Sequence, residues 1–339
     1  MNNLDINNTD FSDSVSNWYL SSGRANLPWR KNISPYRIWI SEIMLQQTQV
    51  KTVIPFFKKF IKKYPNLKSI SVASEDDILA LWSGLGFYRR AKNIFKTKEI
   101  IKNNYKNIFP KNFEELILLP GIGRSTAGAI MSIAYEKSYP ILDANVKRII
   151  SRFDNINIQS KGALKSLWLL SESYTPNNDI FEYTQGIMDL GATVCHIRSP
   201  MCTDCPLKLS CKNAFREFNV IKKNKKQKLT KKINFTLAHS NQFFLLFRRN
   251  EKSFWESLWI PYDNQYRGRR NLFKQPIKSE IQYFNHALSH IDLDISVEIF
   301  DYDKPFKIQT NLEHQWINKE EINEFGLPKP IKSIIENYV

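Results

Sequence analysis

The four cysteines of the 339-residue chain lie within one segment of seventeen residues, at Cys195, Cys202, Cys205 and Cys211. Their spacing is C-x6-C-x2-C-x5-C, with no cysteine elsewhere in the chain. Two disulfides are not expected in so short a segment in a reducing compartment, so a shared metal centre is the better interpretation. Zinc is the alternative, because four thiolates can hold it tetrahedrally, although zinc sites usually contain two close CxxC pairs. Three unequal intervals suit an iron–sulfur cubane, in which each iron atom takes one thiolate.

A second motif, LPGIGRSTA at residues 119–127, places one proline and two glycines between two predicted helices. The first helix is predicted over 113–118, and the second, rich in alanine and other small residues, over 125–134. We expect Gly121 and Gly123 to form a tight hairpin with positive φ angles, which glycine adopts most readily. Such a turn also lets backbone N–H groups converge on an anion, for example a DNA phosphate.

Two acids accompany these motifs. About twenty residues after the hairpin, LDANVKR places Asp143 directly before a predicted helix. Its carboxylate could simply cap that helix, and this position would also favour the ionised form. Glu42 lies in SEIMLQQTQV within a predicted amphipathic helix, where a glutamate is ordinarily a solvated surface residue. Both residue types permit acid–base chemistry, so the surrounding motifs must decide whether they perform it.

The composition indicates the class of molecule that positions these residues. Lys and Arg number 49 against 33 Asp and Glu, which gives a formal net charge of +16. Such an excess favours a polyanionic partner, because neutralised phosphates release condensed counterions; a codon bias toward Lys, Asn and Ile is the alternative explanation. The first fourteen residues contain no apolar segment, and no stretch approaches ~18 uninterrupted apolar residues. We therefore expect a cytoplasmic protein that does not enter a membrane.

The hairpin motif, LDANVKR and the cysteine spacing together resemble the helix–hairpin–helix DNA glycosylase superfamily. Two upstream segments, LPWR at 27–30 and WISEIMLQQTQ at 39–49, narrow the resemblance to the MutY-type adenine DNA glycosylases. The similarity runs from about residue 15 to 212, and more weakly to the C-terminus. Several motifs agree in order and spacing, which makes the resemblance specific.

The resemblance implies a mainly α-helical, helix–hairpin–helix glycosylase fold for a catalytic domain over residues 1–215. A six-helix lobe is expected at about 30–140. An iron–sulfur cluster lobe is expected from 1–29 together with 141–215. The catalytic cleft would lie between the two lobes, and the four cysteines would hold one [4Fe–4S] cluster per chain.

The chemistry that the resemblance implies uses both acids. Adenine is a poor leaving group until it is protonated, and the sugar becomes oxocarbenium-like as the glycosidic bond breaks. Glu42 is expected to deliver a proton to adenine N7 and later to handle the attacking water. Asp143 is expected to stabilise the positive charge at the sugar, and Asn145 to help orient this group.

DNA contacts follow from the same resemblance. Gln46, Gln47 and Thr48 resemble a wedge that enters the duplex when the target adenine is flipped out. Phe87 and Tyr88 resemble an element that inserts beside the oxidised guanine; the family commonly has Tyr where Phe87 stands. Phenylalanine keeps the stacking surface without the hydroxyl, so we expect slightly reduced lesion discrimination. The other predicted contacts are Arg30, Gly121, Gly123, Ser125, Lys147 and Gln185, the last facing the flipped adenine, with Arg24 as a further candidate.

Two rival functions are open to a chain with these motifs. Glycosylases of the endonuclease III type, which act on oxidised pyrimidines, resemble the hairpin and cluster but carry a nucleophilic lysine where this chain has Ser125. Serine cannot form a Schiff base with the sugar, so Ser125 favours a monofunctional glycosylase, with at most incidental Schiff-base reactivity at Lys147. The other rival is a non-catalytic iron–sulfur DNA-binding protein, which the presence of Glu42 and Asp143 disfavours.

The C-terminal third begins with a basic segment. Seven lysines and no acid lie between Lys222 and Lys232, which is typical of a linker, expected over 216–232. The domain that follows, at 233–339, resembles the Nudix-like, α+β module that reads the lesion in this family. Strands are predicted at 236–238, 243–248 and 295–300, and a closing helical stretch at 319–337, interrupted at 327–330.

This C-terminal domain is not expected to hydrolyse pyrophosphates, because the chain contains no G-x5-E-x7-R-E-x-x-E-E metal box. In the family a Phe-Ser-His loop reads the oxidised guanine; here Leu288 replaces the Phe, while Ser289 and His290 keep their hydrogen-bonding capacity. The expected partner is double-stranded DNA with adenine opposite 8-oxoguanine or guanine. The chain is expected to act as a monomer on the nucleoid.

Overall fold

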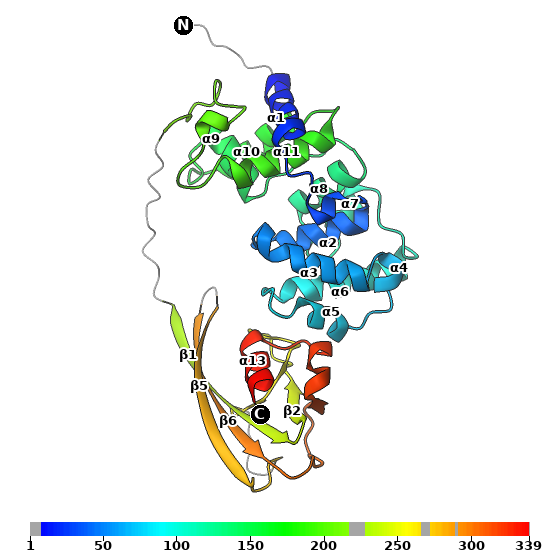
Figure 1. Cartoon of the computed structure of the whole chain (residues 1–339). Coiled ribbons are helices and arrows are strands. Elements are labelled where there is room, and N and C mark those ends of the chain that lie inside the picture. Colours follow the sequence, from blue (N-terminus) through cyan, green and yellow to red (C-terminus); the bar gives the residue numbers. More distant parts are fainter. Residues whose placement is uncertain (1–7, 217–227, 266–271, 289–290, 339) are drawn as a thin grey trace. The chain divides into compact units, whose positions relative to one another are not determined.

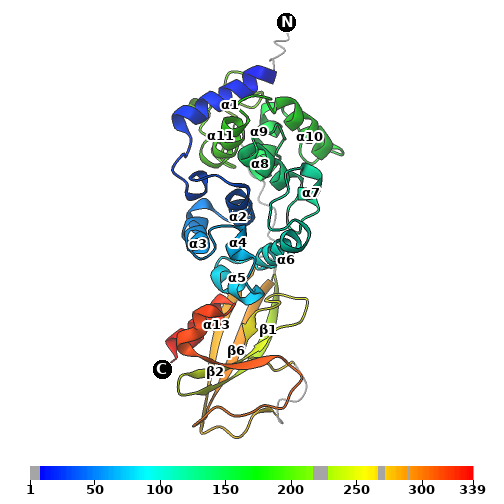
Figure 2. The same cartoon turned by 90° about the vertical axis from the view of Figure 1, so that its right-hand side faces the viewer.

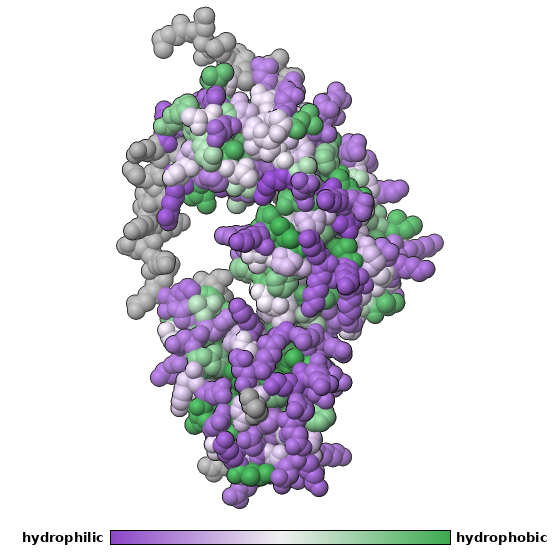
Figure 3. Space-filling view, viewed as in Figure 1, coloured by the Kyte–Doolittle hydropathy of each residue, from purple (hydrophilic) through white to green (hydrophobic). Residues whose placement is uncertain are grey.

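The computed structural model describes residues 8–216, 228–265, 272–288 and 291–338 (Figure 1). The chain divides into two compact units, Met1–Val72 with Lys96–Ile221, and Ala73–Phe95 with Lys222–Val339. No helix in the described part of the chain is long and apolar enough to cross a membrane. On the face drawn in Figure 3, hydrophilic side chains predominate, and apolar ones form scattered patches.

The first unit is helical. Its described elements are α1 (Asn8–Ser22), η1 (Pro28–Arg30), α2 (Pro35–Leu45), α3 (Val50–Lys63), α4 (Leu67–Ile70), α7 (Phe113–Ile117), α8 (Arg124–Ala134), α9 (Ala144–Phe153), α10 (Ala163–Tyr174), α11 (Ile180–Thr193) and η2 (Cys202–Asp204). Helix α6 (Arg89–Asn104) begins in the second unit and continues into the first. The two helices predicted around the hairpin are confirmed as α7 and α8.

Helices from both ends of this unit's sequence pack together. Helix α1 packs against α10 and α11, and α9 packs against the same two helices. Figures 1 and 2 both show α1 beside α11. Helix α2 packs against α3 and α8, and α11 also reaches α8. Helix α8, which is rich in small residues, packs closely at Gly128, where an added Cβ would lie 2.3 Å from the Pro140 carbonyl oxygen.

Helix α2 is buried on most of its circumference, which decides the environment of Glu42. Ser34 caps its N-terminus by accepting a hydrogen bond from the Arg37 backbone N–H, and Pro35 occupies its first turn. Seven of its eleven residues are buried. A helix that is apolar around most of its surface lies in a core, not on a solvated face. The surface-acid interpretation of Glu42 is therefore wrong.

The second unit contains a sheet with strand order β3-β2-β1-β6-β5. Its described strands are β1 (Leu229–Ser240), β2 (Phe243–Arg248), β3 (Trp259–Ile260), β4 (Tyr262–Asp263), β5 (Lys278–Ala287), β6 (Ile291–Asp301) and β7 (His314–Asn318). Strands β1 and β6 are parallel, with Leu229 opposite Ile291, whereas the other pairs are antiparallel. A buried cluster that includes Ala238, Leu245 and Phe247 forms part of its core.

The strands predicted at 236–238, 243–248 and 295–300 are confirmed within β1, β2 and β6. The interrupted helical end is confirmed as η3 (Lys319–Glu324) and α13 (Lys329–Asn337). Strand β1 already begins at Leu229, inside the range predicted as linker, because it pairs there with β6. Residues 217–227 of that predicted linker lie outside the described residues.

The units also differ from the predicted domains at residues 73–95. Residues 73–95, expected in the six-helix lobe, form a compact unit with the C-terminal third. They include helix α5 (Glu75–Trp82), which packs against η3. Ion pairs and hydrogen bonds connect α5 and the loop after it with β2, β3 and Leu327.

Candidate active site and cysteine loop

The environment of Glu42 is suited to holding a proton. Its side chain projects from the buried helix α2 and is only partly exposed. Burial, and then the charge of Asp143, raise the pKa of the Glu42 carboxyl to about 8, while the charge of Arg30 opposes the shift. The structure therefore brings the two predicted acids close enough to interact, and Glu42 is largely protonated at neutral pH.

Asp143 is the N-cap of helix α9, as predicted. Its Oδ1 accepts hydrogen bonds from the backbone N–H groups of Asn145 (2.9 Å) and Val146 (2.8 Å). Burial raises the pKa of the Asp143 carboxyl, and the two N–H donors, together with Arg148 and Lys147, lower it. The net shift is upward. The helix N-terminus was expected to dominate, but loss of solvent outweighs it.

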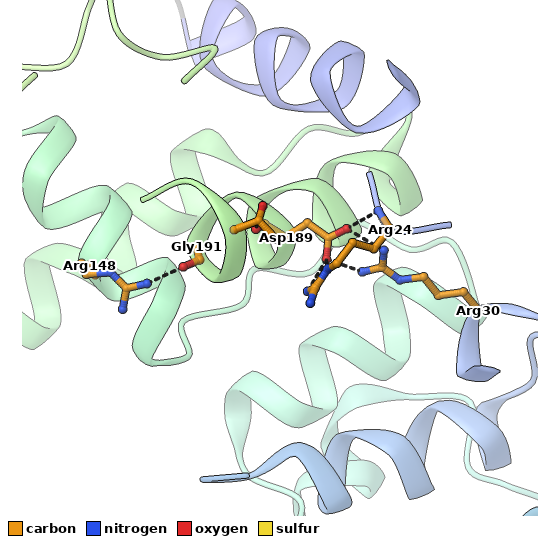
Figure 4. Close-up of polar contacts among 6 residues, drawn as sticks. Arg24, Arg30, Arg148, Asp189 and Gly191 are labelled. Atoms are coloured by element: carbon orange, nitrogen blue, oxygen red, sulfur yellow. Dashed lines mark hydrogen bonds and ion pairs between the residues drawn. The ribbon is translucent and has the colours of Figure 1, made fainter. Parts of the chain in front are cut away.

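The side chain of Asn145 is held in place by Arg148, a residue that was not predicted to belong to the site. Arg148 Nη2 donates to Asn145 Oδ1 (2.9 Å) and to the Gly191 carbonyl (2.6 Å), and its Nε donates to the Cys195 carbonyl (2.8 Å). Figure 4 shows the Arg148 side chain reaching Gly191. Helix α9 thus carries both the acid at its N-terminus and the contact to the cysteine loop. The signal available in the sequence was an arginine one turn after Asn145.

Two arginines converge on the buried carboxylate of Asp189 (Figure 4). Arg24 donates to it through its backbone N–H, Nε and Nη2 at 2.6–2.9 Å, and Arg30 through Nη1 and Nη2 at 2.7–2.8 Å. Burial would raise the pKa of the Asp189 carboxyl, but these hydrogen bonds and charges lower it below its ordinary value. Asp189 was not predicted, although an acid inside an apolar helix needs a cationic partner.

Arg30 was predicted to contact DNA, and the structure gives it a different place. Its side chain is 4% exposed and makes two hydrogen bonds to Asp189. A guanidinium that is buried in this way has little surface to offer a phosphate. The positive charge of Arg30 instead favours the ionised form of Glu42 and so opposes part of the rise in the pKa of that carboxyl.

The predicted wedge lies beside the hairpin. Gln46 Nε2 donates to the Gly121 carbonyl at 3.2 Å, and Thr48 Oγ1 donates to the Gln46 carbonyl at 3.4 Å. Gln47 is exposed, with a positive φ of 55°. Gly121 has the predicted positive φ, 83°. Gly123 does not: it caps α8 with an extended backbone at φ −88°, so the prediction for this glycine is wrong.

The other predicted residues of the first unit occupy three different environments. Ser125 Oγ accepts a hydrogen bond from the Leu142 backbone N–H (3.0 Å), which ties α8 to the residue before Asp143. Lys147 is partly exposed and lies near enough to Asp143 to lower the pKa of its carboxyl. Gln185 is 2% exposed and precedes Asp189 by one turn of α11. Gln185 and Asp189 therefore share one face of that helix.

The predicted lesion-reading residues belong to the second unit. Phe87 is 43% exposed, with a positive φ of 49°. Tyr88 is turned inward: its hydroxyl donates to the Leu327 carbonyl at 3.1 Å. Tyr88 was predicted to contact DNA, but this hydrogen bond directs its polar end into the protein. Ser289 and His290 lie outside the described residues.

The four cysteine thiols line one cavity, together with residues of α9 that include Arg152. All four are partly exposed and none forms a disulfide. Arg152 Nη1 donates to Cys195 Sγ at 3.3 Å, and further bonds from Arg152 reach the His196 and Ile197 carbonyls. Within the described residues, no group of three or more His, Cys, Asp and Glu side chains is arranged as a site for a single metal ion.

The chemistry of this donor set fits a thiolate-bound cofactor. Burial is the main cause that raises the pKa of Cys205 to about 11 and that also raises the pKa of Cys211. A backbone N–H opposes the rise at each residue, and neighbouring cysteines add to it. Clustered thiols lose their protons and become stable thiolates when a cationic centre binds them.

Comparison with known proteins gives the same assignment for both parts of the chain. Residues 40–171 match the HhH-GPD superfamily of base excision DNA repair proteins, and residues 234–337 match the NUDIX domain. Among solved structures, a thermostable thymine-DNA glycosylase is similar over 61% of this chain and 96% of its own, with 28% identity and a TM-score of 0.55.

Two curated relatives match nearly the whole chain. The adenine DNA glycosylase of Buchnera aphidicola subsp. Schizaphis graminum is 42% identical, over 96% of this chain and 98% of its own. The adenine DNA glycosylase of Buchnera aphidicola subsp. Acyrthosiphon pisum is also 42% identical, over 97% of each chain. Identity at this level over both domains shows that the chain belongs to the adenine DNA glycosylase family, hydrolases that act on N-glycosyl bonds in the base excision repair of double-stranded DNA.

Proposed function

We propose that this chain hydrolyses the N-glycosidic bond of adenine opposite 8-oxoguanine or guanine, and that it does so without cleaving the strand. The observation that carries the proposal is the partly buried pair of Glu42 and Asp143, in which the pKa of Glu42 is raised to about 8. A glycosidase needs one carboxylic acid and one carboxylate at the bond it breaks. This pair can supply both at neutral pH.

The two acids would act in sequence on one nucleotide. Protonated Glu42 donates its proton to adenine N7, so that the base leaves as a neutral molecule. Ionised Asp143 stabilises the positive charge that develops on the sugar, and Glu42, now a carboxylate, accepts a proton from the attacking water. Asn145, fixed by Arg148, keeps the first turn of α9 in place beneath Asp143.

The target adenine must leave the base stack before it meets these acids. We propose that Gln46, Gln47 and Thr48 fill the space that it vacates, because Gln47 is exposed and its neighbour Gln46 is hydrogen-bonded to Gly121 of the hairpin. Converging N–H groups at Gly121 and the cationic Lys147 would hold the backbone of the damaged strand. Gln185 would face the flipped base from α11. The net charge of +16 favours this partner.

We propose that Cys195, Cys202, Cys205 and Cys211 hold one [4Fe–4S] cluster. When bound, the cluster supplies the cross-link that fixes the loop after α11. Arg148 and Arg152 connect that loop to α9, so the loop in turn supports the helix that presents Asp143.

We further propose that residues 1–215 work as the catalytic domain and 233–339 as the lesion-reading domain of a monomer acting on nucleoid DNA. Within the lesion-reading domain, Ser289 and His290 are proposed to contact the oxidised guanine.

The monofunctional reaction is supported by Ser125. Its Oγ is engaged by the Leu142 backbone N–H, and it offers no amine for attack on the sugar. Lysine at this position in enzymes that resemble endonuclease III would form a Schiff base and cleave the strand. The reaction proposed here leaves an intact strand bearing an abasic site.

The experiment that tests this function is a single-turnover assay on three duplexes, containing adenine opposite 8-oxoguanine, adenine opposite guanine, or thymine glycol. We expect excision from the first two, no excision of thymine glycol, and strand breaks only after alkali or heat. Thymine glycol excision with efficient borohydride trapping would instead support the endonuclease III-like function. Tight binding without release of any base would support the non-catalytic rival.

A further inference from the structure

The loop that carries Phe87 has an unusual backbone. Gly84 and Gly86 have φ angles of 96° and 78°, and Phe87 itself has 49°. A bulky residue in the left-handed region is strained, and such strain persists only where the surroundings over-determine the conformation. Phe87 is nevertheless 43% exposed, so its own ring contributes little to holding the loop. The restraint must come from its neighbours.

One set of restraints comes from within the segment. The carbonyl of Gly86 accepts hydrogen bonds from Trp82 Nε1 (3.0 Å) and Arg90 Nη2 (3.1 Å). The Arg90 guanidinium lies 5.3 Å from the centre of the Phe87 ring and 5.4 Å from that of Trp82. These contacts fix the peptide that precedes Phe87.

A second set comes from the C-terminal third of the same unit. The carbonyl of the fully buried Leu327 accepts hydrogen bonds from Ser83 Oγ (3.0 Å) and from the Tyr88 hydroxyl (3.1 Å). The Tyr88 hydroxyl also accepts a bond from the Gly84 backbone N–H at 3.3 Å. One carbonyl, 239 residues or more away in sequence, thus holds both ends of the loop.

The Leu327 carbonyl is itself fixed relative to this segment. Arg248 of β2 pairs with Asp76 (2.6 Å) and Glu75 (3.1 Å) at the start of α5, and Trp259 Nε1 donates to Asp76 (3.3 Å). Gly326 packs so closely that an added Cβ would lie 2.5 Å from Leu79 Cβ. These contacts leave the carbonyl little freedom to follow a shift of the loop.

We infer that Ser83 and Tyr88 are positioning residues that fix the Phe87 ring through the Leu327 carbonyl, so that the C-terminal segment at 326–327 contributes to lesion discrimination through residue 87. The inference rests on the proposed function and on the expectation, drawn from the family resemblance, that Phe87 inserts beside the oxidised guanine. It assigns to this segment a role separate from that of any residue that contacts the lesion directly. A loop held at both ends presents the ring in one orientation, whereas a released loop would lose the strained conformation and the advantage it gives to one opposite base.

The test removes the two hydroxyls by Tyr88→Phe and Ser83→Ala, singly and together. Tyr135→Phe is the matched control, since the Tyr135 hydroxyl also donates to a backbone carbonyl, Pro110 at 3.0 Å, but in the first unit. The readouts are single-turnover excision on duplexes with adenine opposite 8-oxoguanine and opposite guanine, and amide hydrogen exchange of residues 84–88. We expect Tyr88→Phe to lower the ratio of the two rates about fivefold, the size of effect of one hydrogen bond, and to speed exchange in the loop.

The effect must also pass through Phe87. In a Phe87→Ala background, which lowers the ratio by itself, Tyr88→Phe should lower it no further. The inference is overturned if Tyr88→Phe and the double variant keep the parent's rate ratio and exchange, if Tyr135→Phe changes the ratio as much, or if the effects of Phe87→Ala and Tyr88→Phe simply add. Failure of the proposed function is a different result, in which the parent itself excises no adenine while the exchange difference at 84–88 persists.

Discussion

Two carboxyl groups in one buried site cannot both ionise freely, and their surroundings decide which one keeps its proton. Asp143 has two backbone N–H donors at a helix N-terminus, and Arg148 and Lys147 further favour its charged form. For Glu42, Arg30 alone lowers the carboxyl pKa, against burial and the charge of Asp143. Arg30 is itself engaged by Asp189. At the scale of single residues, this asymmetry supports the proposed roles of Glu42 as the acid and Asp143 as the group that stabilises the positive charge.

The pH dependence of excision should report this asymmetry. Because the active form has Glu42 protonated, the rate under subsaturating, single-turnover conditions should fall as pH rises through about 8, by about tenfold per pH unit beyond it. On the acid side the rate should fall as Asp143 takes up a proton, above the ordinary pKa of an aspartate. Binding of the same duplex, measured at each pH, separates this loss from weaker association. A rate that stays level from pH 7 to 10 with unchanged binding would be incompatible with Glu42 as the acid.

Residue-level predictions succeeded where the chemistry is local and failed where it depends on distant partners. The cap by Asp143 follows from its place before a helix, two and three residues from its donors. The pairing of Asp189 with Arg24 and Arg30 joins residues 165 and 159 positions apart, so no local pattern contains it. Arg30 was predicted from the family resemblance to contact DNA, and no local pattern indicates its bonds to Asp189.

At the scale of elements, sequence patterns predicted the hairpin well and the edge of the sheet poorly. Helices α7 and α8 and the turn between them depend on Pro, Gly and small residues that act within a few positions. Strand β5 was missed. Its apolar residues Ile281 and Tyr283 are 52% and 73% exposed, while Gln282 lies on the half-buried side with Phe284. The alternation of apolar and polar residues therefore predicts that Ile281 and Tyr283 face the core, whereas the structure places them on the exposed face. The pattern fails because this edge strand buries neither face fully.

The hairpin offers a matched pair of substitutions. Gly121→Ala should destabilise the fold by about 1–2 kcal/mol, because alanine is strained at a φ of 83°. Gly123→Ala should cost about 1 kcal/mol or less, because φ is −88° and an added Cβ meets nothing within 4 Å. Urea unfolding of both variants compares them directly. Equal losses, or a larger loss for Gly123→Ala, would contradict the hairpin geometry.

At the scale of the whole molecule, helix α9 connects the cysteine loop with Asp143. Asp143 is the N-cap of helix α9, directly before its first residue. Arg148 and Arg152, on later turns of the helix, bond to Cys195 and its neighbours. A group that fixes the cysteine loop therefore also supports the position of the acid. The cysteine spacing was visible in the sequence, whereas this connection depends on the packing of α9 against α11.

Metal content tests the cofactor. Protein purified without oxygen should contain about four irons per chain, as a cubane requires. Cys202→Ala should lose iron and DNA affinity first, because Cys202 lies in η2 of the loop and away from the bonds that Arg148 makes. Elemental analysis and duplex binding measure the two effects. One zinc and no iron in the parent protein would overturn the cluster assignment.

The role of Glu42 as the acid is tested by comparing Glu42→Gln with the parent on one duplex containing adenine opposite 8-oxoguanine, by single-turnover excision and equilibrium binding. The amide cannot donate the proton that lets adenine leave, so excision should fall by at least about 10²-fold. Affinity should fall far less, because the wedge at Gln46 and the hairpin at Gly121 are separate from the carboxyl. A variant that excises adenine at nearly the parent's rate would contradict the assignment of Glu42, and a parent that releases no adenine would contradict the function as a whole.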